Sequence, residues 1–326
     1  MMKKVMKIIL LIIFAIVILI VGAFVSLTLI VNYQNANYYK LAKPQGEIEK
    51  KYTPLGSYDV SYTEASAEND TYKKYEIWYP AAMSTSQDTY PVVIMANGTG
   101  VKASQYKEVF KHLSSWGFIV AGNEDENSRT GASSEATLEY LITQNSDSNS
   151  IFYHKLDLEH IGIGGHSQGG VGAVNAVTQQ KNGNMYKALF TASITSTALA
   201  SADVLGAEWV YDISKVTIPC FMVAGTKHAD AGTAADKNAT EGQGISPLWS
   251  MTANYNALPD TVDKVMARMV NKDHGDMLRG ADAYMTAWFM YYLKDVKNVE
   301  NCFYGNNAEI MTNTLYQDQK SNQHVQ

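Results

Sequence analysis

The residues with the clearest chemical potential form the run Gly165-His166-Ser167-Gln168-Gly169. Its G-x-S-x-G spacing is typical of a serine held in a strained turn between a strand and a helix. The apolar run 161–164 precedes it, and a stretch rich in small residues, 169–177, follows it. The two flanking glycines let the strand and helix backbones approach each other closely. This context predicts a nucleophile at Ser167 rather than a glycine-rich turn with an incidental serine.

A serine hydroxyl is a poor nucleophile at neutral pH, so it needs a base and an acid that orients the base. In hydrolases with this motif the chain order is serine, then Asp or Glu, then histidine. His274 follows the last predicted strand and fits the base. Asp230 fits the acid, with Asp236 further along the same loop as the alternative. We expect His228 in the wall of the substrate cleft or behind the catalytic groups.

The same residues allow a second interpretation. His228, Asp230, His274 and Asp276 form two H-x-D pairs that are conceivable ligands of a metal ion. The pairs lack the tight spacing that marks a metal site in sequence. We therefore expect no metal and no cofactor.

An acyl-transfer enzyme also needs N–H donors for the oxyanion of its tetrahedral intermediate. One is expected to be the backbone N–H of Gln168, directly after the serine. The second is expected from the loop Asn97-Gly98-Thr99-Gly100, whose glycines let the backbone turn its N–H groups inward. Trp209 and Trp249 are candidates for an apolar cleft, although aromatic residues at such positions are as often part of the core.

The elements that must position these groups alternate along the chain. Apolar residues recur at helical spacing in 106–113, 171–177 and 281–293, and two alternating stretches, 58–62 and 75–79, predict an antiparallel pair at a sheet edge. Continuously apolar runs predict strands buried on both faces; they cover 92–96, 118–121, 160–164, 188–192, 220–224 and 265–270. The pattern predicts an α/β fold with a mainly parallel, eight-stranded sheet and helices on both faces. The segment 195–218 is too short for a helical cap domain.

The N-terminus is predicted to be a membrane anchor. Residues 8–31 carry no charge and as a helix would span roughly 36 Å, enough for a hydrocarbon core of about 30 Å. The lysines among residues 1–7 predict that this tip stays in the cytoplasm. A stalk (32–54), a catalytic domain outside the membrane (55–310) and a polar tail (311–326) would follow. The alternative is a long signal sequence whose cleavage releases a secreted protein.

Composition excludes several classes of protein. The 326 residues are 46% hydrophobic, which is enough for a large core, and carry a net charge of −6. Such an acidic chain lacks the basic surface that nucleic acids require, so no nucleic acid partner is expected. The sequence contains two cysteines, Cys220 and Cys302, which is too few for a disulfide-rich scaffold. They form either a single disulfide or buried free thiols. We expect a monomer.

From about Tyr58 to Gly305 the chain resembles α/β-hydrolases of the bacterial cutinase/polyester-hydrolase and dienelactone-hydrolase-like group. The matching stretches are 91–100, 115–120, 161–170, 219–230, 273–276 and 287–295. The resemblance implies that Ser167 is the nucleophile, His274 the base and Asp230 the acid, and that the backbones of Thr99 and Gln168 form the oxyanion hole. The polar insert 231–244, the missing pair of C-terminal cysteines and the apolar N-terminus depart from the pattern of that group.

These observations predict a serine hydrolase of carboxylic esters, anchored in the cell membrane with its catalytic domain outside. Its substrates would be lipid esters, acetylated wall polymers or short soluble esters. A binding domain that kept the fold without catalysis is the alternative from another class. An acyltransferase or a peptidase with the same catalytic groups is the alternative among enzymes.

Overall fold

The computed structural model describes residues 2–305 and 307–322 of the chain. It divides into two compact units, one up to Lys43 and one from Pro44 onward. The first unit consists of the helices α1 (Met2–Ala36) and α2 (Tyr38–Leu41).

The predicted membrane anchor, 8–31, lies inside α1. None of the helices, within the residues that the structure describes, combines the length and apolar composition needed to cross a membrane. The structure therefore does not support this part of the prediction.

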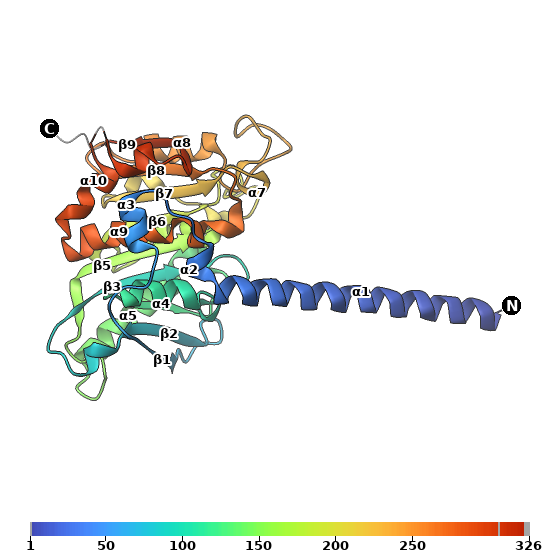
Figure 1. Cartoon of the computed structure of the whole chain (residues 1–326), viewed down its shortest axis with the longest axis horizontal. Coiled ribbons are helices and arrows are strands. Elements are labelled where there is room, and N and C mark those ends of the chain that lie inside the picture. Colours follow the sequence, from blue (N-terminus) through green and yellow to red (C-terminus); the bar gives the residue numbers. More distant parts are fainter. Residues whose placement is uncertain (1, 306, 323–326) are drawn as a thin grey trace. The chain divides into compact units, whose positions relative to one another are not determined.

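The second unit is built on one sheet of nine strands in the order β1-β2-β4-β3-β5-β6-β7-β8-β9 (Figure 1). Its central strands, from β4 to β8, are parallel, whereas β1, β2 and β9 run antiparallel to their neighbours. The strands are β1 (Val60–Ser66), β2 (Lys74–Pro80), β3 (Tyr90–Ala96), β4 (Ile119–Asn123), β5 (Leu156–His166), β6 (Tyr186–Ala192), β7 (Cys220–Gly225), β8 (Lys264–Met269) and β9 (Tyr316–Ser321). The sheet confirms the predicted α/β architecture.

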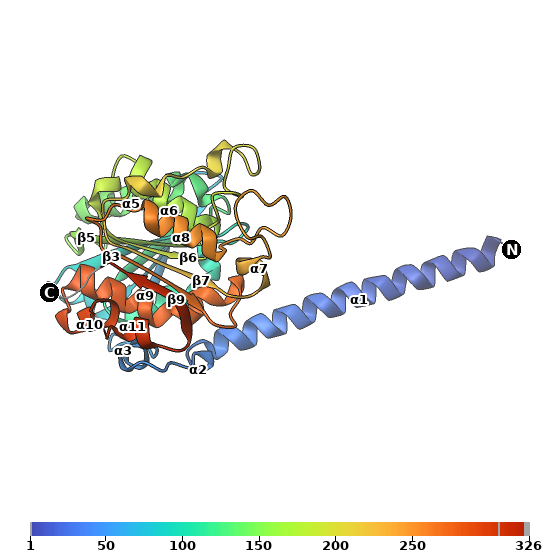
Figure 2. The same ribbon diagram turned by 90° about the horizontal axis from the view of Figure 1, so that it is seen from above.

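Helices cover both faces of this sheet (Figure 2). On one face lie α5 (Ala132–Ser146), α6 (Gln168–Gln179) and α8 (Leu248–Ala257). On the other lies α9 (Met277–Lys294), with α4 (Lys107–Ser115) and α3 (Glu47–Tyr52) packed against it. Three single-turn helices complete the described set: α7 (His228–Ala231), α10 (Glu300–Phe303) and α11 (Glu309–Thr312).

The core explains why the apolar runs become strands. Ile94, Ile163 and Leu189 of the central strands are fully buried and belong to one apolar cluster with Val171 and Val174 of α6. On the opposite face, Trp288 of α9 packs against the ring of Phe221 with ring centres 5.6 Å apart. Strands with apolar residues on both faces are stable only where helices cover both sides of the sheet.

Two expected boundaries differ from the structure. Residues 44–54, predicted as part of a stalk, belong to the compact unit, because the Glu309 carboxylate accepts the N–H groups of Ile48 and Glu49 and Tyr52 is buried. Residues 316–321 were predicted as part of the polar tail, but they form a strand that pairs with β8. The sheet therefore has nine strands and not the predicted eight. Residues 323–326 of that tail lie outside the described residues.

Between β6 and β7 the chain forms only two single 3₁₀ turns, so no helical cap intervenes there.

Candidate active site

Ser167 lies in the sharp turn between β5 and α6 that the glycine spacing predicted. Its φ of 60° is in the left-handed region, which is unfavourable for a residue with a side chain. The turn requires the flanking glycines: a Cβ at Gly165 would lie 2.0 Å from the Gly169 carbonyl oxygen, and a Cβ at Gly169 would lie 2.1 Å from the Ala96 carbonyl oxygen. The Ser167 N–H donates to the Ala192 carbonyl at the end of β6, at 2.9 Å. Strain of this kind is concentrated at functional sites.

Asp230 lies in the single-turn helix α7 after β7, and His274 lies in a 3₁₀ turn after the neighbouring strand β8. The Nδ1 atom of His274 is 2.7 Å from the Oδ1 atom of Asp230. Asp230 is fully buried, while the His274 side chain is 19% exposed. With its Nδ1 proton directed at the carboxylate, the imidazole has Nε2 as its basic nitrogen. This arrangement suits a base whose tautomer and orientation are set by a buried acid.

Asp236, the alternative acid, lies in an exposed loop. Its Oδ1 atom accepts the N–H of Asn238 at 2.7 Å within that loop. The geometry therefore favours Asp230 over Asp236 as the partner of His274. Among the residues that the structure describes, no three His, Cys, Asp or Glu side chains are grouped to hold a metal ion.

Asp273 holds the acid loop and the base loop together. Its Oδ1 atom accepts the backbone N–H groups of Ala229, Asp230 and His274 at 2.9, 3.2 and 2.9 Å. Burial alone would raise the pKa of Asp273, but these three donors, together with a smaller contribution from the neighbouring His228, hold the pKa below its ordinary value. The carboxylate stays ionised at neutral pH and fixes the two loops to each other. Sequence analysis did not identify this residue.

His166, the second residue of the motif, packs against the base. The two imidazole rings have centroids 4.5 Å apart, and the Nε2 atom of His166 is 2.9 Å from the His274 carbonyl oxygen. Burial, and next the neighbouring His274 ring, lower the pKa of His166 to about 4. His166 is therefore neutral at physiological pH and places no second positive charge beside His274. Its position within the motif was the only sequence signal for this role.

Thr99 and Gln168, the expected oxyanion residues, are in contact. The Nε2 atom of Gln168 donates to the Oγ1 atom of Thr99 at 3.0 Å, so the loop after β3 meets the start of α6. The loop's neighbouring N–H groups are already used: Gly98 donates to the Tyr106 hydroxyl and Gly100 to the Glu126 carbonyl, both at 3.0 Å. Thr99 is thus the candidate donor of this loop.

The three residues expected in the cleft lie in different surroundings. Trp209 lies in a 3₁₀ turn, with the Arg129 guanidinium 5.6 Å from the centre of its ring. Trp249 of α8 lines a cavity of about 380 Å³ together with Leu248 and Arg268. His228 is exposed at the start of α7. The structure gives none of the three a hydrogen bond or ring contact to Ser167 or His274 among the described residues.

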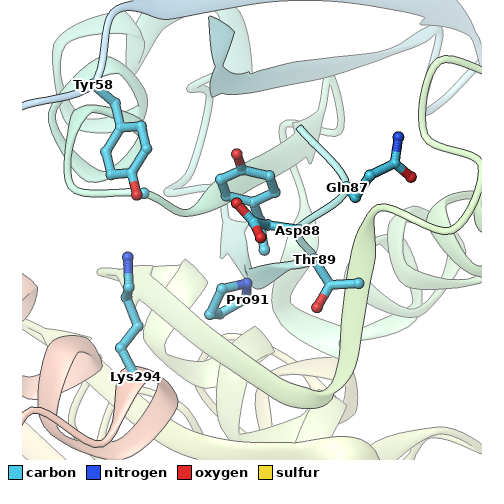
Figure 3. Close-up of a pocket in the computed structure, with 8 residues that line it drawn as sticks. Tyr58, Gln87, Asp88, Thr89, Pro91 and Lys294 are labelled. Carbon is cyan, nitrogen blue, oxygen red and sulfur yellow. The ribbon is translucent and has the colours of Figure 1, made fainter. Parts of the chain in front are cut away.

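A larger cavity of about 540 Å³ lies at the end of the strands opposite to Ser167. Figure 3 shows the side chains that line it. It is lined by Tyr90 and Pro91 at the start of β3, whereas Ser167 follows the end of the neighbouring β5. The Lys294 ammonium in its wall donates to the Trp116 carbonyl at the end of α4, at 3.0 Å, and lies over the Tyr58 ring (Figure 3). A lysine at a helix C-terminus has this structural role. The cavity is separate from the candidate catalytic groups.

The two cysteines do not pair. Cys220 and Cys302 are free and fully buried. Burial raises the pKa of the Cys220 thiol to about 12, so it is protonated and unreactive at physiological pH. This resolves the choice between a disulfide and buried thiols in favour of the thiols.

A comparison with known proteins places the chain in a family. No curated protein matches the chain. The model of a family described as PET hydrolase-like matches residues 42–311, which cover nearly all of the compact unit. The chain therefore belongs to the PET hydrolase-like family, a group of α/β-hydrolases related to cutinases and polyester hydrolases.

Proposed function

We propose that this protein is a serine hydrolase of carboxylic esters in which Ser167 is the nucleophile, His274 the base and Asp230 the acid. Family membership already indicates a hydrolase that acts on esters. The observation that carries the finer proposal is the 2.7 Å hydrogen bond between His274 and the buried Asp230. The His274 ring also packs against that of His166, the residue directly before the strained Ser167.

The reaction follows from the roles of these groups. His274 Nε2 accepts the Ser167 hydroxyl proton as Oγ attacks the ester carbonyl, and the N–H groups of Thr99 and Gln168 stabilise the oxyanion. The protonated His274, stabilised by Asp230, then gives its proton to the leaving alcohol. Water attacks the resulting acyl-enzyme by the same route, with His274 again as the base. The neutral His166 favours this cycle, because a second cation would oppose protonation of His274.

Substrate size is a further element of the proposal. Only 3₁₀ turns lie between β6 and β7, where related folds can carry a helical cap. An uncapped site suits bulky acyl groups or esters on a surface. Trp209, Trp249 and His228 remain candidates for the cleft.

The test is hydrolysis of p-nitrophenyl esters of increasing acyl length by the full chain, with Ser167→Ala as the blank. We expect turnover that the substitution abolishes, and labelling of the wild-type protein at Ser167 by a fluorophosphonate. Activity that survives in Ser167→Ala would show that another residue is the nucleophile. A folded wild-type protein with neither turnover nor label would instead indicate a binding domain without catalysis.

The cellular location is a separate proposal that rests on the sequence. The uncharged run 8–31, preceded by lysines, supports an anchor with the catalytic unit outside the cytoplasm. The structure offers no independent support for a membrane span among its described helices. Fractionation of cells that express the full chain or a chain without 8–31 tests it. Carbonate-resistant membrane association that requires 8–31 is expected, whereas full-length protein in the soluble fraction would refute the anchor.

A further inference from the structure

Ser193 follows β6 directly and has an unusual backbone conformation. Its φ of 50° lies in the left-handed region, as does that of Ser167, and the residue is fully buried. Its N–H donates to the Val223 carbonyl of the adjacent β7 at 2.7 Å. A buried non-glycine residue persists in this conformation only where its surroundings hold it there, and such residues cluster at functional sites.

The Ser193 hydroxyl reaches the proposed catalytic acid. Its Oγ atom donates to Oδ2 of Asp230 at 2.5 Å. The Gly225 N–H donates to the same oxygen at 2.6 Å, while the other carboxylate oxygen faces His274. The buried carboxylate is therefore held by one hydroxyl, one backbone N–H and the base itself. Because the carboxylate is buried, each of these bonds is stronger than it would be at the surface.

We propose that Ser193 is a positioning residue for catalysis, which holds Asp230 so that its Oδ1 atom faces His274 Nδ1. A carboxylate can rotate about its Cβ–Cγ bond, and the two donors on Oδ2 oppose that rotation. The residue before Ser193 serves the nucleophile, because the Ala192 carbonyl accepts the Ser167 N–H. Two consecutive residues at the end of β6 thus support both the nucleophile and the acid. This inference rests on the proposed function of Ser167, His274 and Asp230.

The first test is Ser193→Ala in the full chain, with kcat and KM measured on a p-nitrophenyl ester. Loss of a hydrogen bond to a charged group should lower kcat by at least about tenfold. KM should stay unchanged, since the hydroxyl is buried behind the acid. Ser193→Gly removes the same hydroxyl and relieves the positive φ, so it provides a well-folded second variant for which we expect the same loss.

The matched control is Thr191→Val, two residues earlier in the chain, within β6. The Thr191 hydroxyl is equally buried but has no hydrogen-bond partner among the described residues. Its loss should leave kcat within about twofold of wild type, as expected for a site without a catalytic contact. A tenfold loss in this variant would mean that kcat responds to any hydroxyl removed from β6, which would overturn the specific role of Ser193.

A double-mutant cycle separates positioning from a purely structural role. If Ser193 acts through Asp230, then Ser193→Ala should have no further effect on kcat, or on the rate of fluorophosphonate labelling, in an Asp230→Ala background. The same fold loss in both backgrounds would overturn the inference, as would an unchanged kcat in the single variants. In both cases the active wild type would leave the proposed function standing. A wild-type chain with neither ester turnover nor label at Ser167 would overturn the proposed function and the inference with it.

Discussion

Substitution of Gly169 by alanine tests the geometry of the oxyanion hole. A Cβ at this position would lie 2.1 Å from the Ala96 carbonyl oxygen and 2.9 Å from that of Asn97, whereas real Cβ contacts are essentially never under 3.0 Å. The first turn of α6 must therefore move away from the end of β3 by about 1 Å. Gln168 lies on one side of this contact and Thr99 on the other, so the two proposed oxyanion donors would separate.

The size of the effect follows from that displacement. A misplacement of about 1 Å at a catalytic group costs about 100-fold in rate, so kcat on a p-nitrophenyl ester should fall by about that factor in Gly169→Ala. The clash should also destabilise the fold by about 1–3 kcal/mol and lower Tm by about 2–10 °C. In a helix without the clash, alanine would instead stabilise by about 1 kcal/mol.

The control for this experiment is Gly275→Ala. Gly275 follows His274, and a Cβ there would meet no atom within 4 Å. Its activity and Tm should stay close to those of the wild type. If Gly169→Ala keeps its activity and has an unchanged or higher Tm, the close approach of α6 to β3 does not exist, and the proposed oxyanion hole loses its structural basis.

Three further predictions concern the acid, a buried carboxyl group and the thiols. Asp230→Asn should lower kcat by about 10⁴-fold, as does loss of the orienting acid in other triads, whereas Asp236→Asn should stay active; the opposite result would reassign the acid. Burial, reinforced by the Glu309 charge, raises the pKa of Glu49, although three hydrogen-bond donors partly oppose it. Protonated Glu49 therefore stabilises the folded state, fully so below the ordinary glutamate pKa of about 4.3. This stabilisation is lost as the pH rises through the raised pKa of the folded state. Tm measured from pH 4 to 8 should therefore fall more in the wild type than in Glu49→Gln, and parallel curves would contradict this. Ellman's reagent should react with Cys220 and Cys302 only after unfolding, and rapid reaction of the folded protein would show that these thiols are accessible.

The central sheet was predictable because its signals are local. The runs 92–96 and 220–224 became β3 and β7 with boundaries within two residues, since a continuous apolar run of this length is stable only inside a covered sheet. The turn at Ser167 was predictable for a similar reason, because a Cβ at Gly165 would meet the Gly169 carbonyl oxygen within the motif itself.

The edge of the sheet was not predictable in the same way. The strand β9, with the sequence Tyr-Gln-Asp-Gln-Lys-Ser, is polar and lacks the alternation of a half-buried strand. It forms because its backbone pairs with β8 and because the Arg268 side chain of β8 reaches Asp318 at 3.1 Å. Helix α3 likewise depends on Glu309, more than 250 positions away in the chain. Contacts between distant residues leave no periodic signal.

The residues of the candidate site also fall into those that the sequence could predict and those that depend on distant contacts. Ser167, His274 and Asp230 could be proposed from chain order, but the preference for Asp230 over Asp236 became firmer only with the distance to His274. Ser193 and Asp273 had no signal, because a serine or an aspartate in a loop is common in any sequence. Their roles depend on the atoms they face.

At the end of the sheet that carries Ser167, the loop after each strand is hydrogen-bonded to the loop or strand end beside it. The Asn97 side chain after β3 donates to the Asn123 and Asp125 carbonyls at the end of β4, at 2.6 and 2.8 Å. The turn after β5 is bonded to β6 through Ser167, and the loop after β7 is bonded to that after β8 through Thr226 and Lys227, whose N–H groups both donate to the Lys272 carbonyl.

Such a continuous network has a consequence for catalysis. Donors that already point at the reacting atoms cost little reorganisation when charge develops, and this preorganisation accounts for much of the stabilisation of an oxyanion. Ser193 joins two parts of the network, since it bonds β7 through its backbone and Asp230 through its hydroxyl. A substitution that loosens one bond should therefore impair the alignment of nucleophile, base and acid together. The coupling measured between Ser193 and Asp230 is the quantity that expresses this most directly.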